Sequence, residues 1–350
     1  MAQQYGRWVI KRSLSQGGQA HTYLVFDPNE GEDNLYVLKR FLNPNRLQRF
    51  ENEVKAALKL EHPNLIRQID FDLSGEKPFI VTEYCPGGTL EDADFKSWST
   101  LDLLQLFRAI CQGVAYAHNN RVIHRDLKPA NIFLKRDGRT PVVGDFGICF
   151  FLDNGERVTL TDEAVGARKY TAPELEDGRT DLIGAQADVY SLGKILYRLM
   201  AGRIFDREKH RDPTWNLTGE QVDLPDYKRA ELAFVNELLD HSVVQDLGRR
   251  FSDANHFRAN LDRAIFRIQR HAHTLDLKEP QICNFCGLGQ YKDVGNSMLG
   301  DEPYGYDEVE RFGIRHVDGA KWLILWCNYC GHVETFRIDT IRDKSVWRLS

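Results

Sequence analysis

Two hydrophobic periodicities divide most of the chain. From residue 5 to residue 84, apolar and polar positions alternate, and the runs at 36–38 and 79–81 are rich in β-branched and aromatic residues, which predicts strands. Apolar positions three and four residues apart predict one amphipathic helix over 45–60, which His62-Pro63 ends. This part of the chain is therefore expected to be β-rich with a single helix.

From residue 85 to residue 272 the spacing becomes helical. One strongly apolar helix is predicted around 103–115, a second at 188–200 with Gly202 as its C-terminal cap, and a last one at 253–272. Between the first two lies 120–174, which is rich in Gly, Pro, Asp and Asn and poor in periodicity. Loops of that length inside a compact domain usually carry function.

The remaining segment, 273–350, is strand-like at 322–326 and 333–338. It also holds two C-x-x-C pairs, each followed by glycine, and we interpret them as two knuckles of one metal site. The chain as a whole is thus expected to be α+β, with a β-rich part, a helical part and a small β-rich tail.

The composition is that of an ordinary soluble globular protein, with 350 residues, 42% hydrophobic and 28% charged. No apolar run is long enough for a spanning helix, and the start has no apolar signal core, so we expect a cytoplasmic protein without membrane association. The net charge of −5 makes nucleic acid an unlikely partner.

The strings that carry chemistry lie in and beside the long loop. His124-Arg125-Asp126-Leu127-Lys128-Pro129-Ala130-Asn131 is followed by Asp145-Phe146-Gly147 and then by Ala172-Pro173-Glu174. Upstream, Lys39 ends a predicted strand and Glu53 lies on the helix that follows. This order resembles the eukaryotic-type protein kinase family, of the Ser/Thr kind, from about Val9 to Arg263.

The resemblance implies a two-lobed protein kinase fold, with an N-lobe at 5–84 and a C-lobe at 85–272. It also implies ATP and Mg²⁺ as cofactors, and protein substrates. Asp126 is the expected base that orients the substrate hydroxyl, and Lys128 would lie beside the transferred phosphoryl group. Asn131 and Asp145 would hold Mg²⁺ through oxygen atoms.

The same resemblance assigns the ATP-binding residues. Lys39 would hold the α- and β-phosphates and pair with Glu53, Thr82 would be the gatekeeper, and the backbone from Glu83 to Cys85 would face adenine. The phosphate loop would be Ser15-Gln16-Gly17-Gly18-Gln19-Ala20. Three further residues have structural roles in the family: Asp188 ties down the catalytic loop, and Arg250 pairs with Glu174.

The chain departs from the family pattern at two places. Ser15 and Ala20 replace the first and third glycines of the phosphate loop, and Ala167 stands where Ser/Thr kinases usually carry threonine. Two alternatives therefore stay open. One is a non-catalytic pseudokinase that serves as a nucleotide-gated scaffold, and the other is a small-molecule phosphotransferase on a related fold.

Regulation by autophosphorylation is a further hypothesis. In the family, the arginine at the position of Arg125 often receives a phosphate from the activation segment. Thr159 and Thr161 lie in that segment and are the candidate phosphosites. An activation segment that is ordered without modification is the open alternative.

The tail pairs are Cys283-Asn-Phe-Cys286 and Cys327-Asn-Tyr-Cys330. Four thiolates suit a closed tetrahedral Zn²⁺ site, and the arrangement resembles a zinc ribbon over 273–350. A redox dithiol or four unrelated core cysteines are the alternatives. Acidic residues outnumber basic ones in this segment, which favours a protein partner or a structural cap over nucleic acid.

Overall fold

The computed structural model describes residues 4–16, 20–42, 55, 57–146, 169–176, 184–203, 217, 226–271, 291–293, 322–327 and 333–337. The chain divides into two compact units, Met1–Asp223 with Val235–Leu261, and Leu224–Phe234 with Asp262–Ser350. The domain boundaries drawn from the sequence at 84 and 272 stay predictions. None of the helices in the described ranges has the length and apolar character needed to cross a lipid bilayer.

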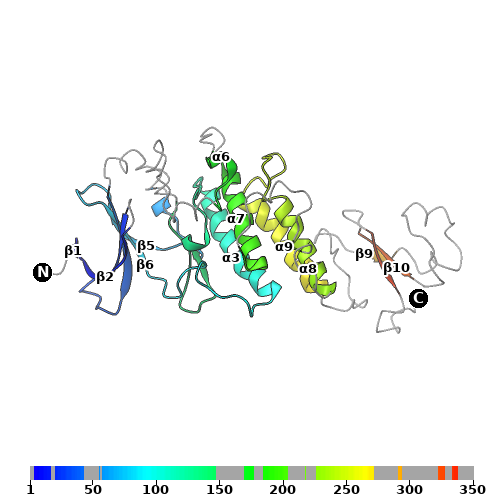
Figure 1. Cartoon of the computed structure of the whole chain (residues 1–350), viewed down its shortest axis with the longest axis horizontal. Coiled ribbons are helices and arrows are strands. Elements are labelled where there is room, and N and C mark those ends of the chain that lie inside the picture. The colour runs from blue at the N-terminus through cyan, green and yellow to red at the C-terminus, as the bar shows by residue number, and fades with distance from the viewer. Residues whose placement is uncertain are drawn as a thin grey trace. The chain divides into compact units, whose positions relative to one another are not determined.

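Six antiparallel strands form the β-rich part of the first unit, drawn in blue and cyan in Figure 1. In their order across the sheet they are β1 (Gln4–Tyr5), β2 (Trp8–Gln16), β3 (Ala20–Phe26), β4 (Leu35–Phe41), β6 (Phe79–Glu83) and β5 (Gln68–Asp72). The runs at 36–38 and 79–81 fall within β4 and β6. Both strands predicted from the sequence are therefore confirmed.

Each face of this sheet carries its own apolar cluster, because side chains alternate along a strand. One cluster comprises Tyr5, Trp8, Tyr23, Val25, Leu38, Phe79 and Val81, and the other Ala20, Phe41, Leu73 and Ile80. Trp8 Nε1 donates to Asp70 Oδ2 at 2.8 Å, which joins the start of β2 to the edge strand β5. Because this bond links two strands that are not neighbours in the sheet, the sheet is curled. The second cluster lies on the face of the sheet that carries Lys39.

The helix predicted over 45–60 lies mostly outside the described residues. At its C-terminal end Lys55, Ala57 and Leu58 are helical, and the chain turns at Lys59. The helix has therefore ended before His62-Pro63, as the sequence predicts.

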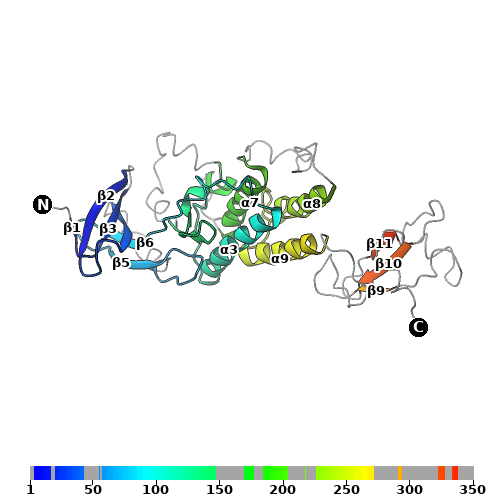
Figure 2. The same cartoon turned by 90° about the horizontal axis from the view of Figure 1, so that it is seen from below.

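Two helices of the helical part, α3 (Thr100–Asn119) and α7 (Ala185–Ala201), lie side by side in both views (Figures 1 and 2). Ser99 begins α3 with a capping box to Asp102. Gly202 ends α7 with φ 66°, a left-handed conformation that glycine adopts without strain, so the predicted C-terminal cap is confirmed.

The later helices are α8 (Asp226–Asp240) and α9 (Ala254–His271). The prediction of a last helix at 253–272 is confirmed by α9. The sequence pattern did not single out α8 as a separate helix.

The loop predicted over 120–174 contains short regular elements in its described part. They are the 3₁₀ turn η1 (Pro129–Asn131), the strands β7 (Ile132–Leu134) and β8 (Pro141–Val143), and helix α6 (Pro173–Glu176). β7 and β8 pair in antiparallel fashion. Three-residue strands are too short to show a periodicity, which is why the pattern predicted a loop here, although Pro141-Val-Val by itself is strand-like in composition.

The second unit contains a three-stranded antiparallel sheet in the order β11-β10-β9, labelled in Figure 2. Its strands are β9 (Tyr291–Asp293), β10 (Trp322–Cys327) and β11 (Val333–Arg337). The two strands predicted at 322–326 and 333–338 are confirmed over their described residues. β9 was not predicted.

Candidate active site

A cleft of about 410 Å³ lies between the β-sheet and the segment around residues 124–131, which is called the catalytic loop below. Val37 and Ile80 of the sheet form part of one wall, and Ala130 and Phe133 form part of the other. Six residues that the sequence predicted to bind ATP or metal line it: Ser15, Lys39, Thr82, Glu83, Cys85 and Asp145. An apolar slot with a few convergent polar groups is what a nucleotide requires.

Other predicted ATP-binding residues are placed differently. Ala20 is buried in the apolar cluster with Phe41 and Ile80. Gln16 ends β2, while Gly17, Gly18 and Gln19 lie outside the described residues, as does Glu53. The expected pairing of Lys39 with Glu53 therefore stays a prediction.

Lys39 forms an ion pair with Asp145, with 3.2 Å between Nζ and Oδ1. Desolvation raises the pKa of Asp145, but the charge and hydrogen bond of Lys39 outweigh it, so the pKa lies below its usual range. Asp145 is therefore ionised at neutral pH. A carboxylate in that state is a suitable ligand for a hard divalent cation.

The catalytic loop gathers the other predicted residues around one carboxylate. Lys128 Nζ and Asn131 Nδ2 each lie 2.9 Å from Asp126 Oδ2, and Asn131 Nδ2 also donates to the Asp126 carbonyl at 2.7 Å. The backbone N–H of Gly144 donates to the Asn131 carbonyl at 2.9 Å, which joins the loop to the neighbour of Asp145. The structure thus brings Asp126, Lys128, Asn131 and Asp145 into one site.

The carboxylate of Asp188, on α7, fixes the backbone of the catalytic loop. It accepts hydrogen bonds from the backbone N–H groups of His124 (2.7 Å) and Arg125 (2.8 Å), as the sequence predicts. Burial raises the pKa of Asp188, but the hydrogen bond from His118 and the other donors lower it further, so the carboxylate is ionised. Arg125 and Asp145 have φ values of 66° and 55°, and such strained backbone persists only where contacts hold it.

One residue of this site that was not predicted from the sequence is His118, near the C-terminal end of α3. Its Nε2 lies 2.9 Å from Asp188 Oδ2, and its Nδ1 accepts from the Ala254 N–H at 3.1 Å. Because Nδ1 accepts, the ring proton is on Nε2 and points at Asp188. A histidine among the apolar positions of a buried helix was the one available signal.

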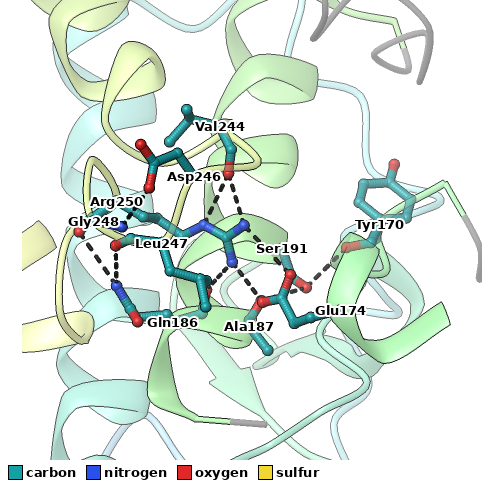
Figure 3. A network of polar contacts seen from close by, with 10 residues as sticks. All are labelled: Tyr170, Glu174, Gln186, Ala187, Ser191, Val244, Asp246, Leu247, Gly248 and Arg250. Atoms are coloured by element: carbon teal, nitrogen blue, oxygen red, sulfur yellow. Dashed lines mark hydrogen bonds and ion pairs between the residues drawn. The ribbon is translucent and has the colours of Figure 1, made fainter. Parts of the chain in front are cut away.

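A second buried pair anchors the segment after the catalytic loop. Arg250 Nη1 lies 2.6 Å from Glu174 Oε1, with both side chains almost completely buried, as the sequence predicts. The guanidinium also donates to the carbonyls of Val244 and Gln186 (Figure 3). Helix α6 is therefore tied to α7 and to the turn before α9.

Cys85, in the segment 83–85 that joins the sheet to the helical part and is called the hinge below, gives a test of the cleft geometry. Burial raises the pKa of Cys85 to about 11, Glu83 adds to the shift and Lys135 opposes it. Because the thiolate is the nucleophile, alkylation of Cys85 by iodoacetamide at pH 7.5 is expected to be roughly two orders of magnitude slower than in the urea-unfolded chain. Timed labelling followed by peptide mass spectrometry measures this ratio. Equal rates in the folded and unfolded chain would contradict the buried position.

Comparisons with known proteins give the family. The model of the protein kinase domain matches residues 8–252. Serine/threonine-protein kinase PrkC of Bacillus subtilis is 30% identical over 269 residues, which are 74% of this chain and 41% of PrkC. Serine/threonine-protein kinase Pkn1 of Myxococcus xanthus is 30% identical over 255 residues, 71% of this chain and 36% of Pkn1.

Solved structures agree on the fold. The crystal structure of the Mycobacterium tuberculosis PknI kinase domain has a TM-score of 0.55 and 22% sequence identity, and the match covers 75% of this chain and 98% of that one. The chain spans about two fifths of the length of the curated relatives named above. ATP and Mg²⁺ are typical of protein kinases, and the two-lobed fold predicted from the motifs is confirmed. The chain therefore belongs to the protein kinase family.

Proposed function

We propose that this chain is an active kinase that transfers the γ-phosphoryl group of ATP to Ser or Thr hydroxyls of proteins, itself included. The observation that carries the proposal is the cluster at Asp126, where Lys128 and Asn131 hold the carboxylate beside the Asp145 segment. A scaffold that only bound nucleotide would have no need of that cluster. Asp126, Lys128, Asn131 and Asp145 all keep the residue types that the kinase pattern requires, and the departures at Ser15, Ala20 and Ala167 lie elsewhere in the sequence.

Each residue has a separate task in the reaction. Asp126 would accept the proton of the incoming hydroxyl and aim its oxygen, and Lys128 would neutralise charge on the moving phosphoryl group. Lys39 would hold the nucleotide phosphates at the cleft wall. Since the amide nitrogen of Asn131 is engaged with Asp126, its oxygen and the Asp145 carboxylate are the atoms that would hold Mg²⁺. When bound, Mg²⁺ supplies charge neutralisation at the phosphates.

The experiment is a radiolabelled ATP assay on a general protein substrate and on the chain itself, followed by phosphoamino-acid analysis. We expect labelled phosphoserine or phosphothreonine that requires Mg²⁺ and disappears in Asp145→Asn. Labelled small alcohols in place of labelled protein would indicate the phosphotransferase alternative.

We propose that Thr159 or Thr161 is an autophosphorylation site that Arg125 recognises. Both threonines lie outside the described residues. The support is Arg125, whose backbone is fixed on Asp188 in a strained conformation beside Asp126. Mass spectrometry of the chain after incubation with ATP is expected to find one of the two phosphorylated. The absence of phosphate from both in active protein would end this proposal.

We also propose that the tail is a zinc ribbon that contacts a protein partner or caps the chain. Cys327 is the last residue of β10 and β11 begins at Val333, so the second C-x-x-C pair starts where two antiparallel strands connect. Tyr291, five residues after Cys286, pairs in register with Cys327. That register supports two knuckles at one end of the sheet. Cys283, Cys286 and Cys330 lie outside the described residues.

Zinc analysis tests the ribbon. The purified chain is expected to carry about one Zn²⁺, because four thiolates make a closed tetrahedral site. Cys327→Ser is expected to lose the metal, and Cys85→Ser, in the other unit, is the control that keeps it. Structural zinc typically contributes about 10–16 kcal/mol to coupled binding and folding, so chelation should also unfold the tail. Background zinc in reduced wild-type protein would refute the site.

A further inference from the structure

Arg198, near the end of α7, joins two segments that are far apart in the sequence. Its Nη1 lies 2.6 Å from Glu91 Oε1 and 3.1 Å from the hydroxyl of Tyr170, and its Nη2 donates to the Glu91 carbonyl at 2.9 Å. Glu91 is 107 residues away in sequence and Tyr170 is 28 residues away. One guanidinium therefore bridges the segment after the hinge and the segment before α6.

The Tyr170 side of this bridge is rigid. The tyrosine is buried, and its carbonyl accepts a hydrogen bond from the hydroxyl of Ser191 on α7 at 2.8 Å (Figure 3). Pro173 begins α6 only three residues later. This segment, ending in Ala172-Pro173-Glu174, is the one that would form the platform for a protein substrate.

The Glu91 side is fixed next to the catalytic loop. Leu90 N–H donates to the carbonyl of Ile132 at 2.8 Å, and Ile132 directly follows Asn131. Thr89, two residues before Glu91, lines the nucleotide cleft. The bridge thus joins the segment that would form the substrate platform to the segment that lines the nucleotide cleft.

The bridge is charged and open to solvent. The side chain of Arg198 is 21% exposed and that of Glu91 is 42% exposed, so a substrate side chain can reach both. Burial lowers the pKa of Arg198, but the hydrogen bonds to Glu91 and Tyr170 raise it further, so the cation persists at any working pH. The two charges cancel locally.

We propose that Arg198 and Glu91 form a charge-balanced bridge beside the bound protein substrate, which keeps this chain from preferring acidic or basic residues next to the phosphorylated hydroxyl. The inference rests on the proposed kinase function. With both charges present, residues that flank the phosphorylated hydroxyl meet no net field. With one removed, the remaining charge selects substrates of opposite sign.

The experiment compares the wild-type chain, Glu91→Gln and Arg198→Gln on two peptides that differ only in flanking Glu or Lys residues around one threonine. Glu91→Gln is expected to shift the ratio of kcat/KM about two- to five-fold toward the acidic peptide, and Arg198→Gln by a similar factor toward the basic one. The KM for ATP should change less than two-fold in both. Opposite shifts are the signature that a merely structural ion pair would not produce.

Shifts in the same direction, or none, would overturn the proposal. The charge swap Glu91→Arg with Arg198→Glu adds a rescue test, because Tyr170 O–H can donate as well as accept. The ratio of peptide KM values should shift in favour of the acidic peptide in Glu91→Arg and of the basic peptide in Arg198→Glu, and the double swap should restore the wild-type ratio. If Arg198→Gln lowers the melting temperature so far that it cannot be assayed, Glu91→Gln alone must still shift the ratio of kcat/KM toward the acidic peptide. Wild type that labels neither peptide nor any protein would instead refute the kinase function itself.

Discussion

Asp126→Asn is expected to lower the rate of phosphoryl transfer by about 10²–10⁴-fold, the usual contribution of a positioned general base. Lys128 and Asn131 both point at Asp126 Oδ2, so they hold this oxygen where a substrate hydroxyl would arrive. Asparagine keeps the shape of the side chain but offers no basic oxygen. Lys39 and Thr82 line the nucleotide cleft, whereas Asp126 is not among its lining residues, so ATP affinity should stay within about two-fold of wild type.

The measurement is kcat on a protein substrate, with ATP binding followed by calorimetry on the same samples. Asp33→Asn is the matched control, since Asp33 is exposed at the turn between β3 and β4 and should leave both values unchanged. Equal transfer by wild type and Asp126→Asn would contradict the proposed role. That result would favour the nucleotide-gated scaffold.

Arg250→Met is expected to lower the free energy of unfolding by about 3–5 kcal/mol, since it leaves the Glu174 carboxylate buried without its partner. The arginine side chain is fully buried and also serves the carbonyls of Val244 and Gln186, so its loss leaves several polar groups unsatisfied. For a domain of this size the melting temperature should fall on the order of 10 °C.

Thermal and urea unfolding of the variants provide the measurement. Arg249→Met is the control, because Arg249 is the exposed neighbour and its replacement should cost little. The double variant with Glu174→Gln should cost less than the sum of the two single changes, since neither charge is then left alone. A loss below about 1 kcal/mol in Arg250→Met would show that the pair is not held as described.

The sequence predicted the elements whose signal is local. Long helices such as α3 and α7 are predicted by the spacing of their apolar residues. The C-terminal cap of α7 is predicted by a glycine, which can adopt positive φ. The catalytic loop was found because its chemistry needs particular residue types in a short, ordered string. The zinc ligands, the phosphosites and the pairing of Lys39 with Glu53 stay predictions, because they fall wholly or partly outside the described residues.

Contacts between residues far apart in the sequence were not predicted. The curled sheet that joins Trp8 to Asp70, the hold of His118 on Asp188, and the bridge from Arg198 to Glu91 connect residues 62, 70 and 107 positions apart. The first and last of these pairs carry no periodicity or motif, and an isolated arginine or glutamate in a sequence is usually a solvated charge. Only His118, at an apolar position of a buried helix, gave a signal.

What this sequence determined by itself is the class of chemistry, because phosphoryl transfer requires a base, a lysine and two oxygen ligands whose spacing along the chain is visible. Only the tertiary structure decided which side chains hold that machinery in place and which distant charges, such as Arg198 and Glu91, come together. Those roles depend on distance and burial, which arise when packing brings distant segments together.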